Sequence, residues 1–432
     1  MNWNKLFGLR SFIRSSLWII PFIAIPLNLV ATRILHWLDA WLGWTLLGYS
    51  ELGAQVVLQA IVTTTLSFVV FTFGSLLVAI QVASAQLTPR IIATTLLRNN
   101  VVKYTVALFT FTLLFALSAQ NRMEKDTHVH QLIMFLAGSL GMISFAAFFH
   151  LIDYASRLLR PVSILAHVGG DGLAVIESVF PDPSFDPGIP EGESLKPSRP
   201  DRVIQHQGTS GIVLAVNLKL LLAEAERLNG VIEFVPQVGD FVAVDEPLFN
   251  LYGGSHSIDD GTLHASVAFG SERTMEQDPT FAFRIVADIA LRALSPAIND
   301  PTTAVLAIDQ LHRLLRMVGK RHLRTDEISD KSGTLRLIFR TPNWEDFVYL
   351  AFSEIRSCGS NNLQIVRRLR AMIQNLIQTL PAHRHQALQQ ELSLLEREIE
   401  RNFTYPEELA LARVADAQGL GGRSGKYLTT ST

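Results

Sequence analysis

Residues 56–83 read VVLQAIVTTTLSFVVFTFGSLLVAIQVA, an apolar run without a charged side chain. A helix crosses a hydrocarbon core with about 20 apolar residues, because each residue rises about 1.5 Å along the axis. This run is therefore long enough to cross a membrane. Three further apolar runs of sufficient length lie near residues 17–38, 101–119 and 131–152. Four such runs, separated by short polar loops, predict a membrane α-helical domain with four transmembrane helices over residues 1–160.

The rest of the chain differs in composition. Charged residues make up only 18% of the 432 residues, and most of them follow the fourth apolar run. We therefore predict a cytoplasmic α+β region behind the transmembrane helices. The net charge of -2 gives no reason to expect a nucleic-acid partner, which would need a basic patch or stripe. The single cysteine, Cys358, excludes an intrachain disulfide.

Lysine and arginine are unevenly distributed among the ends of the four runs. They gather before the first run, between the second and third, and after the fourth, at Lys5, Arg10, Arg14, Arg90, Arg98, Lys103, Arg157 and Arg160. The alternate connections are poorer in basic residues. Because basic loops stay in the cytoplasm, this pattern predicts a multi-pass membrane protein with both termini cytoplasmic.

The second run is unusually polar for a transmembrane helix. At about 100° per residue, one stripe holds Gln59, Thr63, Ser67, Gln81 and Ser84, with Gly74 among them. A second stripe, roughly opposite, holds Thr65, Thr72, Ser75 and Gln86. Glutamine amides facing lipid would lose their hydrogen bonds, so both stripes should meet protein or water. Two interpretations remain open: the helix is the packed centre of a bundle, or one stripe lines a water-filled path in an oligomer.

The segment that follows the second run carries Pro89 and Arg90. Proline ends or kinks a helix, so Pro89 predicts where the chain leaves the membrane. Arg90 then stands where a lipid phosphate can pair with it. We expect this segment to anchor the chain at the bilayer surface.

The region after the membrane domain begins with a linker and then turns β-rich. Residues 181–201 are rich in proline and poor in apolar side chains, and short β-prone runs follow at 202–207, 211–216, 231–235 and 241–244. Residues 238–248 resemble the turn-and-strand half of biotinyl- and lipoyl-type barrels, but no modifiable lysine on a hairpin accompanies them. We predict a linker and a small β-barrel-like module over residues 161–270, with no cofactor.

Two helix starts stand out after residue 270. Asp278-Pro279 and Asp300-Pro301 each place an aspartate at the N-cap and a proline at the first helical position. Apolar residues at helical spacing follow both, and helical patterns continue from Trp344 to about Ala415. This predicts a helical cytoplasmic domain over residues 271–415. The glycine-rich end, residues 416–432, is predicted to be a disordered tail.

The turn between these two helices also has two interpretations. The first is helix capping alone. The second is a pocket at a helix N-terminus, where free amides and the helix dipole favour an ion or small anionic ligand. Its candidate residues are Arg273, Glu276, Arg284, Asn299, Asp300, Thr302 and Thr303.

Sequence patterns of common catalytic sites are absent. The chain has no P-loop, no dinucleotide-binding glycine motif, and no zinc-protease or serine-hydrolase signature. Its histidines do not form a ligand set at useful spacing. We therefore expect neither a metal site nor a cofactor, and no enzymatic reaction is indicated.

Four segments carry a resemblance to a known family. They are Gln86-Leu-Thr-Pro-Arg90, Gly239-Asp-Phe-Val242, Arg273-Thr-Met-Glu-Gln-Asp-Pro279 and Ala290-Leu-Arg-Ala-Leu-Ser-Pro-Ala-Ile-Asn-Asp-Pro-Thr-Thr-Ala304. Together they resemble a family of bacterial predicted membrane proteins known as domain of unknown function 2254. The resemblance covers nearly the whole chain apart from the last few dozen residues. It implies a multi-pass protein of the bacterial inner (plasma) membrane and carries no activity with it.

The function must therefore be inferred from the residues themselves. The polar second run and the lack of catalytic motifs favour a homo-oligomeric channel or transport-like protein in the lipid bilayer, with a cytoplasmic sensing or assembly domain. The alternative is a membrane-anchored regulatory or small-ligand-binding protein without transport activity, whose site is the turn at residues 299–303.

Overall fold

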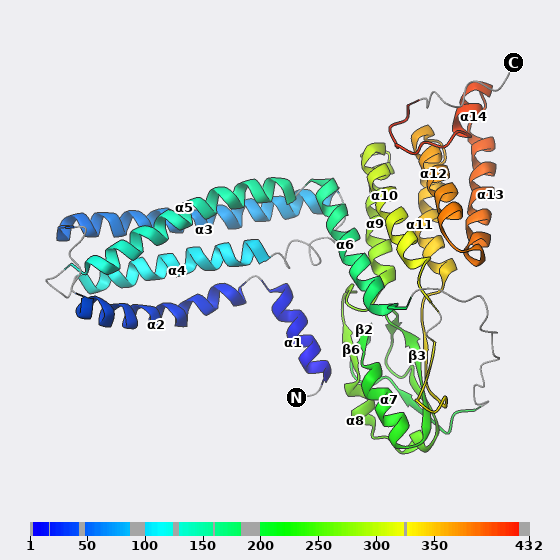
Figure 1. The fold of residues 1–432 in the computed structure, drawn as a ribbon, viewed down its shortest axis with the longest axis horizontal. Helices are drawn as coiled ribbons and strands as arrows, with labels where there is room; N and C mark the ends of the chain where they lie inside the picture. Colours follow the sequence, from blue (N-terminus) through cyan, green and yellow to red (C-terminus); the bar gives the residue numbers. More distant parts are fainter. Residues whose placement is uncertain are drawn as a thin grey trace. The chain divides into compact units, whose positions relative to one another are not determined.

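The computed structural model describes residues 3–16, 18–42, 48–86, 100–123, 129–158, 160–182, 199–323 and 326–422. Contacts divide the chain into two compact units (Figure 1). The membrane unit is built from Phe12–Ala85 and Pro89–Ile164, and the C-terminal unit is built mainly from Leu165–Thr432.

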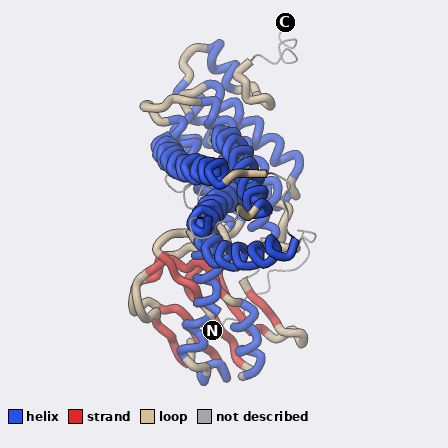
Figure 2. The backbone as a smooth tube through the Cα atoms, turned by 90° about the vertical axis from the view of Figure 1, so that its left-hand side faces the viewer, coloured by secondary structure: helices blue, strands red, loops and turns tan. Residues whose placement is uncertain are grey.

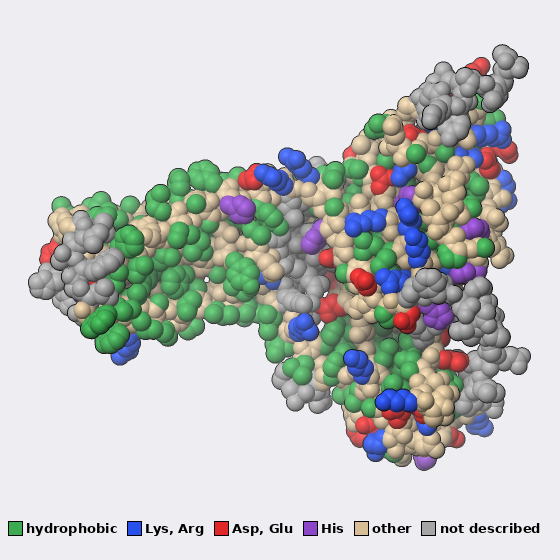
Figure 3. Space-filling model, viewed as in Figure 1, with side chains coloured by type: hydrophobic (Ala, Val, Ile, Leu, Met, Phe, Trp, Pro, Cys, Tyr) green, Lys and Arg blue, Asp and Glu red, His purple; other side chains and the backbone are tan. Residues whose placement is uncertain are grey.

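Long apolar helices make up the membrane unit. After the short α1 (Trp3–Ser15), they are α2 (Ile19–Leu42), α3 (Glu51–Gln86), α4 (Asn100–Met123) and α5 (Gln131–Leu158). The four predicted runs correspond to these four helices. Hydrophobic side chains cover most of their visible surface in Figure 3.

The central helix of the membrane unit is α4. In its most apolar window 44% is buried, against 17% for α3. Polar side chains of α4 pair inside the bundle: Thr112 Oγ1 lies 3.0 Å from Ser144 Oγ of α5, and Asn28 of α2 donates to Ser118 Oγ at 3.0 Å. The interpretation of the second run as the packed centre of its own bundle therefore describes α4 better than α3.

The count of four spans is not confirmed, because the described residues hold five helices long and apolar enough to cross a membrane. The fifth is α6 (Pro161–Val179), which falls where a linker and a β-rich module were predicted. Hydropathy along the chain indicates this helix only weakly, since His167, Asp171 and Glu177 interrupt its apolar residues.

Two separate sheets take the place of the predicted barrel-like module, and no closed barrel is seen in the described chain. One sheet has five strands in the order β1-β5-β3-β8-β7, in which only β3 and β8 pair in parallel, and the other has three in the order β4-β2-β6. The first strands are β1 (Arg202–Gln205), β2 (Gly211–Val216), β3 (Gly230–Gln237) and β4 (Phe241–Val242). The later ones are β5 (Pro247–Gly253), β6 (Val267–Gly270), β7 (Glu327–Ser329) and β8 (Leu335–Arg340).

The strands lie together in one part of the C-terminal unit (Figure 2). Two short helices, α7 (Leu218–Arg227) and α8 (Asp260–Ala265), accompany them. Alternate side chains of β3 are buried in a shared apolar core with Phe249 and Leu337. Strands β7 and β8 lie in the region that is predicted to be helical. The prediction is wrong there because β8 forms a strand through its long-range pairing with β3.

Helices form the rest of the C-terminal unit. They are α9 (Pro279–Leu294), α10 (Pro301–Val318), α11 (Trp344–Gly359), α12 (Leu363–Thr379), α13 (His385–Asn402) and α14 (Pro406–Ala412). The two predicted helix starts are confirmed: Asp278 Oδ1 accepts from the amide of Phe281, and Asp300 Oδ1 accepts from the amide of Thr303, both at 3.1 Å.

A buried arginine holds the end of the described chain. Arg367 of α12 is fully buried, and its guanidinium donates to the carbonyl oxygens of Val414, Gly421 and Gly422 at 2.9–3.1 Å. Asp416 is also buried and accepts from three backbone amides of the same segment. Residues 416–422 of the predicted tail are thus held on α12, and residues 423–432 lie outside the described residues.

Candidate functional site

Helix α3 has one buried ridge with a seven-residue repeat. Leu58, Thr65, Thr72 and Ala79 are each at most 8% exposed. A repeat of seven keeps one line of side chains against a neighbouring helix, as in left-handed helix packing. Phe68 reinforces this contact, because its ring stacks on Phe148 of α5 with 4.2 Å between centroids. The ridge therefore fixes which face of α3 meets its own bundle.

The first polar stripe lies on the opposite side of α3. Ser67, Gly74 and Gln81 each follow a buried ridge residue by two positions, which is a rotation of about 200°. Gln59, Thr63, Ser67 and Gln81 are exposed, and Ser84 is half-buried. A side chain added at Gly74 would meet nothing within 4 Å. The stripe is thus an outward-facing surface of the single chain.

The depth of the stripe follows from contacts between α3 and α5. Ile61 lies against Gly141, and Phe68 lies against Phe148. These two contacts fall around the middle of the α5 candidate span, Gln131–Arg157. Thr63 and Ser67 are therefore at mid-depth, and Gln59 is about 8 Å from that level, within the hydrocarbon half-thickness of about 15 Å. Gln81 is about 25 Å from it, beyond the hydrocarbon core.

The polar side chains of the first stripe differ in their hydrogen bonding. Ser67 Oγ donates to the carbonyl of Thr63 at 2.8 Å, as serine commonly does within a helix. The Gln59 amide has no hydrogen-bond partner among the described residues. An amide without a partner in an apolar medium costs roughly 1–3 kcal/mol by mutational data. Gln59 is therefore the stripe residue that most requires water or another protein surface.

The second polar stripe is partly buried in the bundle and partly exposed. Thr65 and Thr72 belong to the buried ridge, whereas Ser75 is exposed and donates to the Thr72 carbonyl at 3.0 Å. Pro89 and Arg90, predicted to mark the membrane exit, lie outside the described residues.

The turn between α9 and α10 is engaged in capping. Asp300 accepts from both the amide and the hydroxyl of Thr303, at 3.1 and 2.5 Å. Asn299 is exposed and adopts a left-handed backbone with φ 49°, and Thr302 is exposed beside it. The side-chain oxygens of Asp300 are thus occupied by its own helix.

The other residues of the predicted pocket lie elsewhere. Arg273 and Glu276 precede α9, whereas Asn299 follows it, and the 16 residues of α9 span about 24 Å. Arg284 is bound within α9 and by α11, to Asp288 at 2.6 Å and to Glu354. The structure does not bring these side chains together into one cavity.

Two of the family segments quoted above are distant in sequence but lie in contact in the structure, at Gly239 and Asp278. Gly239 has φ +96°, and a side chain there would lie 2.6 Å from Asp278 Oδ2 and 3.6 Å from the Arg273 guanidinium carbon. Asp278 is 3% exposed, and its Oδ2 has no hydrogen-bond partner in the described part of the chain. Burial raises the pKa of Asp278, partly offset by the hydrogen bond from Thr280 and the charge of Arg273.

No cluster of three or more His, Cys, Asp or Glu side chains that could hold a metal ion occurs among the described residues. The long apolar helices and the outward polar stripe define a multi-span membrane protein with a large α+β unit after its spans. The chain belongs to the family described as "Predicted membrane protein (DUF2254)", whose model matches residues 14–375.

Similar proteins extend over most of the chain. Uncharacterised proteins of Mycobacterium bovis and Mycobacterium tuberculosis (strain H37Rv) are each 25% identical over 436 residues, which covers 96% of this chain and 82% of theirs. No solved structure matches the chain with significance.

Proposed function

We propose that this protein is a homo-oligomeric channel or transport-like protein of the inner membrane, in which the α3 stripes of several copies surround a hydrated path. The observation that carries the proposal is the position of Gln59, which is exposed on the side of α3 away from its own bundle and close to mid-depth. A second copy or water would supply the hydrogen bonds that lipid lacks.

The proposal includes four spans, with α6 as a helix of the C-terminal unit. Gly172 of α6 lies against Ala282 of α9 and Leu314 of α10. Farther along, Phe180 packs on Phe347, and Arg321 donates to the Pro181 carbonyl at 2.6 Å. Helices α9 and α10 carry charged residues along their length, so a helix packed on them is unsuited to a hydrocarbon core.

Four spans place α1 and the C-terminal unit on the same side of the membrane. The basic residues before α2 and after α5 make that side cytoplasmic. The C-terminal unit then acts as a cytoplasmic sensing or assembly domain.

Ion flux from vesicles containing the purified full chain tests the proposal. Potassium and chloride efflux are measured for the wild type, Gln59→Leu and Ser67→Leu, with Met142→Leu on α5 as a control that changes an exposed apolar residue away from the stripe. We expect flux in the wild type and in Met142→Leu, and altered flux in the two stripe variants at unchanged thermal stability. Equal flux in all four proteins, or none in the wild type, contradicts a path along the α3 stripe.

The alternative of a ligand-binding regulator has weaker support. Its pocket residues are spread along the length of α9, and Asp300 is engaged by its own helix. Binding of inorganic phosphate to the wild type but not to Asn299→Ala would favour this alternative.

A further inference from the structure

A basic side chain lies within the α2 candidate span. Arg33 is about 21 Å from Ile19 and about 9 Å from Asp39, the two ends of the span at Ile19–Asp39. Asp39 is level with the start of α5, because its Oδ1 accepts from the Leu132 amide at 3.1 Å. Arg33 is therefore about two turns below the end of the membrane region at which α2 finishes.

Arg33 points away from its own bundle. The bundle side of α2 is marked by Asn28 and Thr32, which are 3% and 7% exposed, whereas Arg33 is exposed. No carboxylate among the described residues lies within ion-pair distance of its guanidinium. A charged group at the centre of a span costs roughly 2.5–3.5 kcal/mol on insertion scales, so such residues normally have a partner.

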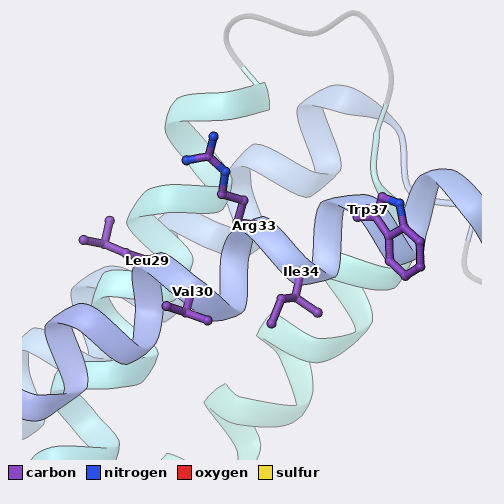
Figure 4. Close-up of a pocket in the computed structure, with 5 residues that line it drawn as sticks. All are labelled: Leu29, Val30, Arg33, Ile34 and Trp37. Atoms are coloured by element: carbon purple, nitrogen blue, oxygen red, sulfur yellow. The ribbon is translucent and has the colours of Figure 1, made fainter.

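The side chains around Arg33 form a groove on the outer face of α2. It has a volume of about 600 Å³ and is lined by Leu29, Val30, Arg33, Ile34 and Trp37. Figure 4 shows these residues along successive turns of the helix, with the guanidinium directed away from the helix axis. Leu29, Val30 and Ile34 are each more than half exposed, so the groove combines one cation with an open apolar floor.

Tryptophan marks the depth of this groove. Trp37 and Trp41 follow Arg33 at one-turn and two-turn spacing and are 69% and 76% exposed. Exposed tryptophan is enriched at the membrane–water interface, where the ring lies among the headgroups. An arginine about one turn below such a ring can extend its guanidinium toward that interface while its methylene groups stay in the apolar region.

We propose that this groove binds one phospholipid of the leaflet that surrounds the end of α2. The phosphodiester accepts hydrogen bonds from the planar guanidinium of Arg33, which matches phosphate in geometry and charge. One acyl chain lies along Leu29, Val30 and Ile34, and Trp37 packs beside the glycerol region. This site does not depend on the channel proposal.

Native mass spectrometry of the detergent-purified full chain tests the site. Phosphatidylglycerol is titrated into the wild type, Arg33→Gln, Arg33→Lys and the control Arg122→Gln, which removes an exposed arginine at the end of α4. We expect one tightly bound lipid per chain in the wild type and the control. In Arg33→Gln this affinity should fall about tenfold or more, as expected for a charge-assisted hydrogen bond, with Arg33→Lys intermediate.

Other outcomes would overturn the proposal. Equal lipid affinity in Arg33→Gln and the wild type would show that Arg33 does not bind the lipid phosphate. Competition by inorganic phosphate at millimolar concentration indicates a free-anion site without an acyl-chain groove. Loss of subunit association with unchanged lipid binding in Arg33→Gln identifies another copy of the chain as the partner of Arg33.

Discussion

Replacing Gln59 by leucine tests the orientation of α3 directly, because its effect has opposite signs in the two possible environments. If the amide pairs with another copy, its loss weakens association. Polar contacts between transmembrane helices contribute about 0.6–2 kcal/mol, so the dissociation constant should rise about 3- to 30-fold. If Gln59 faces lipid, leucine removes an unsatisfied amide and stabilises each chain by roughly 1–3 kcal/mol.

The chain offers a convenient assay for this variant. Cys358 is exposed and is the only cysteine, so donor and acceptor dyes attach at one position per chain. Energy transfer in vesicles, measured as the protein is diluted with lipid, gives the association constant. The matched control is Met142→Leu on α5, which is 70% exposed in the wild type and carries no amide.

We expect the Gln59→Leu curve to shift to higher protein density and the control curve to coincide with that of the wild type. An unchanged or tighter association, together with a higher unfolding temperature, would refute the reasoning. It would show that the stripe faces lipid and that its amide is not part of a subunit contact.

Three further predictions concern the C-terminal unit. Asp278→Asn keeps the capping oxygen but cannot ionise. Since burial raises the folded-state pKa of Asp278, the unfolding free energy of the wild type should fall as the pH rises above about 3.8 toward that raised value. In denaturant unfolding, the free energy of the variant should depend less on pH. A wild-type curve that rises over this range would contradict the pKa shift. Gly172→Ala brings a methyl group 2.8 Å from the Ala282 Cβ and should lower the unfolding free energy by about 1–3 kcal/mol, whereas Gly170→Ala, with nothing within 4 Å, should not. Equal stability of the two glycine variants would mean that α6 does not pack on α9 at Gly172. Arg367→Met removes three hydrogen bonds to the C-terminal segment, and hydrogen exchange of residues 414–422 should accelerate roughly tenfold or more while the sheets stay protected. Unchanged exchange there would mean that Asp416, Gln364 and Arg368 hold the segment without Arg367.

Elements whose signals are local could be predicted from the sequence. The four long apolar runs and the two Asp-Pro helix starts are of this kind, since hydrophobic length and capping depend on neighbouring residues. The early strands at 202–216 and 230–242 also follow from local β-prone composition. The positions of β7 and β8 could not be predicted, because β8 is a strand only through its long-range parallel pairing with β3.

The candidate sites show the same division. The periodicity of α3 established that polar side chains form two stripes, but it did not indicate which of them faces the bundle. The buried ridge of Leu58, Thr65, Thr72 and Ala79 decides that. The proposed pocket at residues 299–303 used residues that are close in sequence, yet a helix of 16 residues separates its two halves.

The sequence by itself determined that this is a multi-span membrane protein, because long uncharged apolar runs can satisfy their backbone polar groups in lipid only as helices. It also determined the family, through motifs spread over most of the chain. Only the tertiary structure decided that Gln59 and Arg33 point outward from the bundle. It also decided that Gly239 contacts Asp278 and that Arg367 binds the backbone of the C-terminal segment. Each of these depends on which surfaces pack together, and packing between distant segments is not encoded in any local pattern.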